Sequence, residues 1–296
     1  MNSRLMRRTI CAAAGLVCAY GSAALARDDP AEWREIETKY IFGFTTSSGI
    51  GLEGEKEFSI DSVARFGKRD GSYAAGQTKI EFEHTPTQFV QIEFGGLLAS
   101  HHIRNVTDLD DRNQVDFSGF FGELRSLVIG RGPGSPLGLT VSIEPEWNRR
   151  DETSGAQVSA YGLETKIAVD TELIENRVYA GVNLLYEPEM VHAQGAWERE
   201  STLGVSGAIA FRLASDLLIG AELGYFRHYD GLALKTFEGD ALYLGPTLYL
   251  QLARKAFMTA AFAAQIAGRE VDNPGVALNL AEFSRSRARL KFAFEF

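Results

Sequence analysis

The last twelve residues, 285–296, alternate between apolar and charged side chains. One parity holds Ala288, Leu290, Phe292, Phe294 and Phe296, and the other holds Arg285, Arg287, Arg289, Lys291 and Glu295. Successive side chains of an extended strand point to opposite faces, so the pattern predicts a β-strand with one apolar and one charged face. A strand of a soluble periplasmic β-sandwich could alternate in the same way, and this pattern alone leaves that alternative open.

The same period of two recurs through most of the chain. Leu242, Leu244 and Leu248 alternate with Tyr243, Gly245 and Thr247, for example. Twelve candidate strands follow from it, near residues 55–68, 72–84, 88–103, 116–130, 137–149, 157–171, 176–189, 200–214, 216–228, 240–253, 256–268 and 284–296. Most are longer than sandwich strands and long enough to cross a bilayer at a tilt.

The connections between these candidates alternate in length. Residues 84–87, 213–216 and 253–255 are tight, whereas 103–116, 189–200, 229–240 and 269–284 are longer and polar. Membrane barrels have short periplasmic turns and longer outer loops, and an even strand count places both ends of the barrel on the periplasmic side. We therefore predict an all-β fold, a single antiparallel transmembrane β-barrel of about 12 strands that spans residues 55–296.

The N-terminus has the layout of a signal peptide. Three arginines precede an uncharged stretch, residues 9–25, that ends in the small-x-small triplet Ala24-Leu25-Ala26. We expect residues 1–26 to be cleaved; a membrane anchor is the alternative, but the stretch is short for a spanning helix. Lipidation at Cys18 is disfavoured because Val17 precedes it, where that signal requires a small residue.

Cleavage would remove both cysteines, Cys11 and Cys18, so the mature chain would hold no disulfide and no cysteine-bound metal. It would also remove three arginines and no acidic residue, which changes the formal net charge from −9 to −12. Such a charge argues against a nucleic-acid partner.

Residues 27–54 do not fit the regular wall. Thr38 to Thr45 looks like a further strand, but a thirteenth strand would break the even count. We therefore expect 27–54 to lie outside the barrel wall, at the periplasmic face or in the lumen. The alternative is that Thr38 to Thr45 joins the sheet and one of the twelve candidates is false.

The C-terminal strand resembles that of proteobacterial outer-membrane β-barrel proteins, which commonly ends in a phenylalanine preceded by alternating apolar residues. Phe292, Phe294 and Phe296 match this pattern. The resemblance covers about twelve residues, together with the general alternation, and indicates no particular subfamily. It implies an outer-membrane location among lipid and lipopolysaccharide, with these three residues as the assembly signal read by the barrel assembly machinery.

The parity opposite the apolar one predicts the side chains that line the lumen. The candidate selectivity residues are Glu81, Glu83, Glu93, Glu123, Arg125, Glu144, Glu146, Glu164, Lys166, Arg212, Glu222, Arg285, Arg287, Arg289 and Lys291. A basic closing strand opposite acidic walls would create a transverse field that orients a charged solute. We predict a monomeric channel or porin-like protein for small hydrophilic or charged solutes; a salt-bridge network that fills a closed structural barrel is the alternative.

An outer-membrane lipid hydrolase is a further alternative. Ser100 and His102 share a strand face, but two residues along a strand are about 7 Å apart, too far for direct proton transfer. Ser100 and His101 point to opposite faces. Residues 108–113 are acidic but lack the glycine and terminal glutamate of a calcium loop. We therefore predict no catalytic residues, no metal site and no cofactor.

Overall fold

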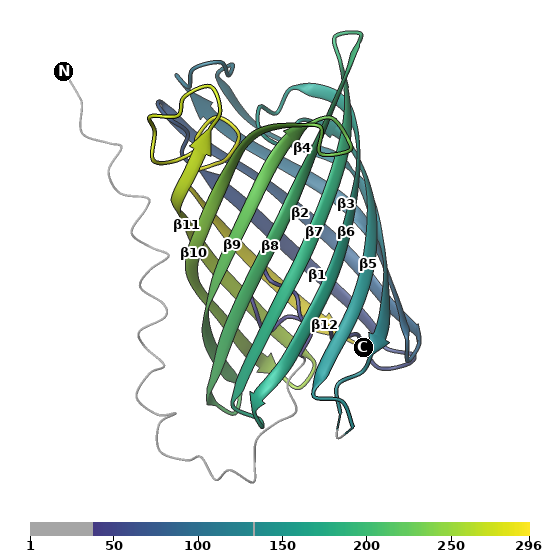
Figure 1. Cartoon of the computed structure of the whole chain (residues 1–296). Coiled ribbons are helices and arrows are strands. Elements are labelled where there is room, and N and C mark those ends of the chain that lie inside the picture. The colour runs from purple at the N-terminus through teal and green to yellow at the C-terminus, as the bar shows by residue number, and fades with distance from the viewer. Residues whose placement is uncertain (1–37, 133) are drawn as a thin grey trace, which may run out of the picture.

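Twelve antiparallel strands close into one barrel in the computed structural model, which describes residues 38–132 and 134–296 (Figure 1). The strands are β1 Lys56–Phe66, β2 Ser72–Thr87, β3 Val90–Arg104, β4 Arg112–Ile129, β5 Leu137–Arg150, β6 Gln157–Ile174, β7 Val178–Ala193, β8 Ala196–Ala214, β9 Leu217–Asp230, β10 Thr236–Ala253, β11 Ala256–Glu270 and β12 Ser286–Glu295. This confirms the predicted all-β barrel. No described helix is long and apolar enough to cross a membrane. The predicted signal peptide, residues 1–26, lies outside the described residues.

Each strand pairs with its neighbours in sequence, and β1 pairs with β12 to close the wall. In that closing pair Phe58 lies opposite Phe294, and Asp61 lies opposite Lys291. The period of two in the sequence becomes the two faces of the wall. Phe294 on the outer face is 53% exposed, whereas Lys291 on the inner face is 2% exposed. The outer face is therefore apolar, as a lipid-facing surface requires, and the inner face is polar.

The barrel has two distinct ends. The C-terminus and the connections β2–β3, β4–β5, β6–β7, β8–β9 and β10–β11 lie at one, which we call the terminal end. The remaining connections lie at the other, the loop end, where the chain from 271 to 285 is the longest link (Figure 1). The expected alternation in length is not strict, because residues 130–136 at the terminal end form as long a link as 105–111 at the loop end.

The prediction of a long loop over 189–200 is wrong. β7 and β8 continue as a paired hairpin up to a two-residue turn at Gln194 and Gly195 and project beyond the other strands (Figure 1). Both turn residues have positive φ, 50° and 83°. A two-residue turn with positive φ at both central positions matches the right-handed twist of the two strands that it joins. This stretch is polar because both faces of the hairpin are exposed to solvent, and it does not form an irregular loop.

Residues 38–51, which we call the luminal segment, pair with no strand of the wall. Most of these residues are buried and none is exposed, even though the segment belongs to no sheet. The chain passes through the lumen and reaches β1 by way of the exposed Leu52 and the backbone hydrogen bonds between Gly54, Glu55 and Thr85.

Candidate functional site

The luminal segment enters and leaves the barrel at the terminal end. Thr38 and Ile50, near its two ends, both line the cavity there. Between them the chain turns back on itself, and the Ser47 amide donates to the Lys39 carbonyl at 3.3 Å. The segment is thus a closed loop of chain that occupies the lumen.

The apex of this loop wraps around one carboxylate. Glu222, on β9, accepts hydrogen bonds from the backbone amides of Phe44 at 2.7 Å and Thr45 at 3.0 Å, and a third from Gly43. Successive amides directed at one anion form a nest, so the carboxylate fixes the backbone conformation. A Cβ at Gly43 would lie 2.2 Å from the Ala261 Cβ, so only glycine fits between the wall and Glu222.

Other wall side chains satisfy the backbone of the segment. Asn183 on β7 accepts from the Thr46 amide and donates to the Thr46 carbonyl, both at 2.7 Å. Thr259 on β11 donates to the Tyr40 carbonyl at 2.7 Å. Further contacts join Ser48 to Asp170, Gly51 to Gln91, Thr45 to Ser206 and Gly43 to Arg289. The wall thus replaces the hydrogen bonds that a strand partner would give.

The segment also has an apolar side. Tyr40, Ile41 and Phe42 are buried in one cluster with Tyr179, Ala208, Ala210, Leu218, Tyr249, Phe257 and Ala293 from the wall. The rings of Tyr40 and Phe257 stack with centroids 5.5 Å apart. These inward apolar side chains lie toward the terminal end of the barrel and give the segment a hydrophobic seat.

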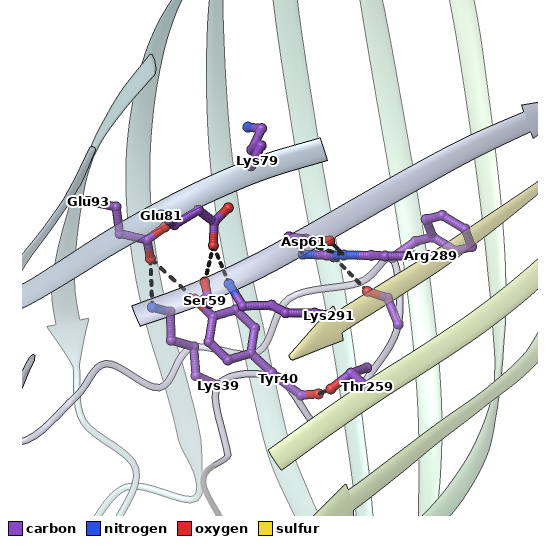
Figure 2. Close-up of polar contacts among 12 residues, drawn as sticks. Lys39, Tyr40, Ser59, Asp61, Lys79, Glu81, Glu93, Thr259, Arg289 and Lys291 are labelled. Atoms are coloured by element: carbon purple, nitrogen blue, oxygen red, sulfur yellow. Dashed lines mark hydrogen bonds and ion pairs between the residues drawn. The ribbon is translucent and has the colours of Figure 1, made fainter. Parts of the chain in front are cut away.

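Lys39 is the charged centre of the segment (Figure 2). Its ammonium donates to Glu93 on β3 at 2.6 Å and also contacts Glu83 on β2. The Tyr40 hydroxyl lies 3.3 Å from Glu83 and 3.2 Å from Glu93. Since the Lys39 side chain is 1% exposed, its pairing with the two glutamates happens away from bulk water. Buried charges of this kind are stable only with their partners in place.

Most of the predicted lumen-lining residues form ion pairs on the inner wall. Arg289 binds Asp61 with Nε 3.0 and 3.1 Å from its two oxygens, and Lys291 binds Glu81 at 2.6 Å (Figure 2). The others are Arg125 with Glu123 at 3.2 Å, Lys166 with Glu164 at 2.6 Å, and Lys79 with Glu144 in direct contact and Glu146 at 3.8 Å. Asp61 and Lys79, which the strand parity also places on the inner face, belong to this network.

Three predicted arginines occupy different surroundings. Arg212 donates to the Ser215 carbonyl at 2.6 Å and so braces the β8–β9 turn. Arg287 lies over the rings of Phe44, Phe226 and Tyr243, at 4.1, 4.6 and 4.7 Å from their centroids. Arg285 precedes β12 and is exposed, because strand pairing begins at Ser286.

The described part of the barrel has a cavity at each end. The cavity at the terminal end has a volume of about 1280 Å³, and Arg131, Arg212 and Tyr249 are among its lining residues. The cavity at the loop end has a volume of about 280 Å³, and its lining includes Glu187, Glu189, Glu200 and Glu282. The luminal segment and the ion pairs lie between these two spaces.

Lys68, in the link between β1 and β2, borders the loop-end cavity. Its titration should make the stability of the folded protein depend on pH. Burial lowers the pKa of Lys68 to about 8, although Glu282 opposes that shift. Between pH 8 and 10.5 the unfolded chain then binds more protons than the folded chain, so stability rises with pH in this window. We expect a gain of up to about 3 kcal/mol, at 1.36 kcal/mol per pKa unit.

Guanidinium unfolding in lipid vesicles, followed by tryptophan fluorescence, measures this gain. The Lys68→Met variant should lack this gain. The difference in free energy of unfolding between the two proteins should therefore change between pH 8 and 10.5. Identical pH slopes would show that Lys68 is hydrated in the folded state.

The residues considered for a lipid hydrolase are placed as strand geometry requires. Ser100 and His102 are exposed on the outer face of β3, whereas His101 is buried on the inner face. The Ser100 hydroxyl is 3.5 Å from the Gly76 carbonyl, and His102 Nδ1 is 3.5 Å from Asn113 Oδ1. Neither contact joins Ser100 to a base.

Residues 34–296 match the model of a protein family described as a family of unknown function, DUF6662. The chain belongs to this family. The match includes the luminal segment, residues 38–51, as well as the wall. No curated protein matches the chain.

Two solved structures show the same architecture as this DUF6662 protein. The COG4313 outer membrane channel from Pseudomonas putida F1 is 10% identical, with a TM-score of 0.54 over 91% of this chain and 100% of that one. The translocator domain of the autotransporter NalP from Neisseria meningitidis is 10% identical, with a TM-score of 0.50 over 83% of this chain and 90% of that one. At such identity the likeness concerns the fold alone.

Proposed function

We propose that the protein is an outer-membrane channel for small hydrophilic or charged solutes, and that the luminal segment holds it closed. The observation that carries this proposal is the way the segment is bound. Its backbone is held by wall side chains such as Glu222 and Asn183, and no described strand of the wall pairs with it. The segment can therefore leave the lumen without opening the sheet.

An outer-membrane location is supported by the apolar outer face and by the closing strand. Phe292, Phe294 and Phe296 lie exposed on that face, in the position expected of a signal for the barrel assembly machinery. The terminal end would then face the periplasm, and the loop end the lipopolysaccharide and the outside. The protein would act as a monomer, since the sheet closes on itself.

Displacement of the segment would leave a lumen that water can fill. The groups it uncovers, among them Asp170, Asn183 and Glu222, are polar and can be hydrated. Twelve strands enclose a wider interior than the eight of barrels whose side chains fill them, and a narrower one than the sixteen to eighteen of general porins. A gated path for small solutes fits this intermediate width.

A disulfide between the segment and the wall should lock the channel. The hydroxyl oxygens of Thr45 and Ser206 are 3.0 Å apart, so cysteines at both positions are close enough to bond. The chain from residue 27 onward has no cysteine of its own. In planar bilayers we expect steps of conductance from the reduced Thr45→Cys/Ser206→Cys protein, almost none after oxidation, and full recovery with dithiothreitol.

The matched control is Ser62→Cys/Thr78→Cys, which joins two residues of the wall whose oxygens are 2.9 Å apart. Its oxidation should leave conductance unchanged. Equal conductance of the oxidised Thr45→Cys/Ser206→Cys protein would show that the segment is not the gate. If folded protein stays silent in every state, including after deletion of residues 27–51, the closed structural barrel replaces the channel.

A further inference from the structure

Four side chains from separate parts of the chain converge at the loop end. The imidazole of His228, on β9, points its Nε2 at three carboxylates: Glu200 on β8 at 3.7 Å, Glu238 on β10 at 3.6 Å, and Glu282 in the link before β12 at 3.6 Å. The ligand atoms of His228, Glu238 and Glu282 all lie within 4.8 Å of one another.

These distances are too long for direct hydrogen bonds, which join such atoms at about 2.7–3.2 Å. They fit a space between the groups instead. Bonds of about 2.0–2.1 Å to a tetrahedral Zn²⁺ place neighbouring ligand atoms roughly 3.3–3.4 Å apart. The ligand atoms of His228, Glu238 and Glu282 lie within 4.8 Å of one another, so side-chain rotations that move them by about 1–1.5 Å would bring them onto one ion, with Glu200 as the fourth ligand.

The charge of the cluster also calls for a cation. Among the described residues, none of Glu200, Glu238 and Glu282 forms an ion pair with a lysine or arginine. Even a protonated His228 leaves two negative charges uncompensated.

The basic residues that line the adjoining cavity have other partners. Arg65 binds Glu152 at 2.7 Å, Lys68 donates to the Ala281 carbonyl at 2.6 Å, and Arg287 lies among aromatic rings. Glu187 and Glu189 line the same space. The unbalanced charge of Glu200, Glu238 and Glu282 is an observation separate from the ligand geometry, and it also favours a bound cation.

We infer that His228, Glu238 and Glu282, together with Glu200, form a binding site for a divalent transition-metal ion, with Zn²⁺ the best match. The imidazole decides between metals, because Ca²⁺ and Mg²⁺ prefer oxygen ligands alone, whereas Zn²⁺ takes nitrogen and carboxylate together. The ion would join β8, β9 and β10 to the 271–285 link and hold that link over the loop-end cavity. Metal binding of this kind does not depend on conduction by the barrel.

Titration calorimetry of the folded, untagged protein in detergent tests the site with Zn²⁺ alone. We expect one ion per chain. His228→Ala should weaken binding by about 100-fold, since losing a ligand costs at least as much as the 10–100-fold lost with an outer-shell partner. Glu282→Gln should weaken it in the same direction, and Co²⁺ should give the visible absorption of a tetrahedral site.

His84→Ala is the matched control, because His84 lies at the terminal end and its Nδ1 is 3.1 Å from the Glu55 carbonyl oxygen. It should bind Zn²⁺ as the unmodified protein does. Heat-modifiable gel mobility verifies that each variant is folded. Absence of one-to-one binding, or binding that survives His228→Ala, would overturn the site, and equal affinity for Ca²⁺ would overturn the choice of metal.

Discussion

With the luminal segment as the proposed gate, the Lys39→Met protein is expected to stay open far longer than the unmodified protein. Methionine keeps most of the volume of the lysine but removes the ammonium between Glu83 and Glu93. Removing one partner of a buried ion pair costs about 3–5 kcal/mol, because the remaining charges are left without compensation. The closed state bears that cost, since water reaches the two carboxylates once the segment has left. At 1.4 kcal/mol per tenfold, the ratio of open to closed channels should rise by about a hundredfold or more.

Single-channel recording measures this ratio, and chymotrypsin gives a second readout. Tyr40, Phe42 and Phe44 are cleavage points that are shielded while the segment stays in the lumen. The variant should be cut there in the folded state, and the unmodified protein should resist.

Two controls accompany Lys39→Met. Lys255→Met, in the exposed β10–β11 turn, should behave like the unmodified protein. Adding Glu83→Gln and Glu93→Gln to Lys39→Met should restore part of the closed state, because no uncompensated charge then remains. If Lys39→Met leaves both conductance and cleavage unchanged, the charge cluster does not hold the segment in place.

The wall of the barrel could be predicted because its signal is local. Strand side chains alternate with a period of two whatever the rest of the chain does. The sequence alone therefore predicts that Leu242 and Tyr243 lie on opposite faces of the wall. Tyr243 is 3% exposed and Leu244 is 45% exposed, as the alternation requires. The ends of strands are harder to predict, because the part of an outer face that lies beyond a lipid layer does not need apolar residues. The polar top of the β7–β8 hairpin resembles a loop for this reason.

The luminal segment has no comparable local signal. Tyr40, Ile41 and Phe42 suggest a strand, and only contacts with distant residues show otherwise. Lys39 and Glu93 are 54 positions apart in sequence, and Thr45 and Glu222 are 177 apart. Sequence parity places Glu222 on the inner face, but its role in holding three backbone amides depends on where another part of the chain lies. Sequence parity therefore predicts the face of the wall on which a side chain lies, but it does not predict which residues that side chain contacts.

The same limit explains why the cluster around His228 went unpredicted. Metal motifs are recognised in sequence when their ligands lie a few residues apart on one element. Here the ligands come from β8, β9, β10 and the link before β12, and only the barrel closure brings them together. A search of inward-facing histidines near strand ends would have found His228.

The opposite characters of the two wall faces predict contrasting effects of one substitution at neighbouring positions of β7. Leu184 is 45% exposed on the outer face, between Ile167 of β6 and Val205 of β8. Leu185 faces inward and lines the loop-end cavity together with Glu187. Leu184→Arg should lower the free energy of unfolding by about 2–4 kcal/mol, the cost of arginine on the lipid face near the bilayer midplane. Leu185→Arg should change it little, because the guanidinium meets water and carboxylates.

Guanidinium titration of both variants in the same phospholipid vesicles gives the two values. The substitutions add the same side chain to adjacent residues of one strand, so propensity and unfolded-state effects nearly cancel in their difference. That difference isolates the medium on each side of the wall. In detergent-free buffer with no lipid, a soluble barrel would tolerate Leu184→Arg better than Leu185→Arg, since the outer face would then meet water. Equal costs in vesicles would mean that the outer face of β7 does not contact lipid, and the membrane location would have to be abandoned together with the channel.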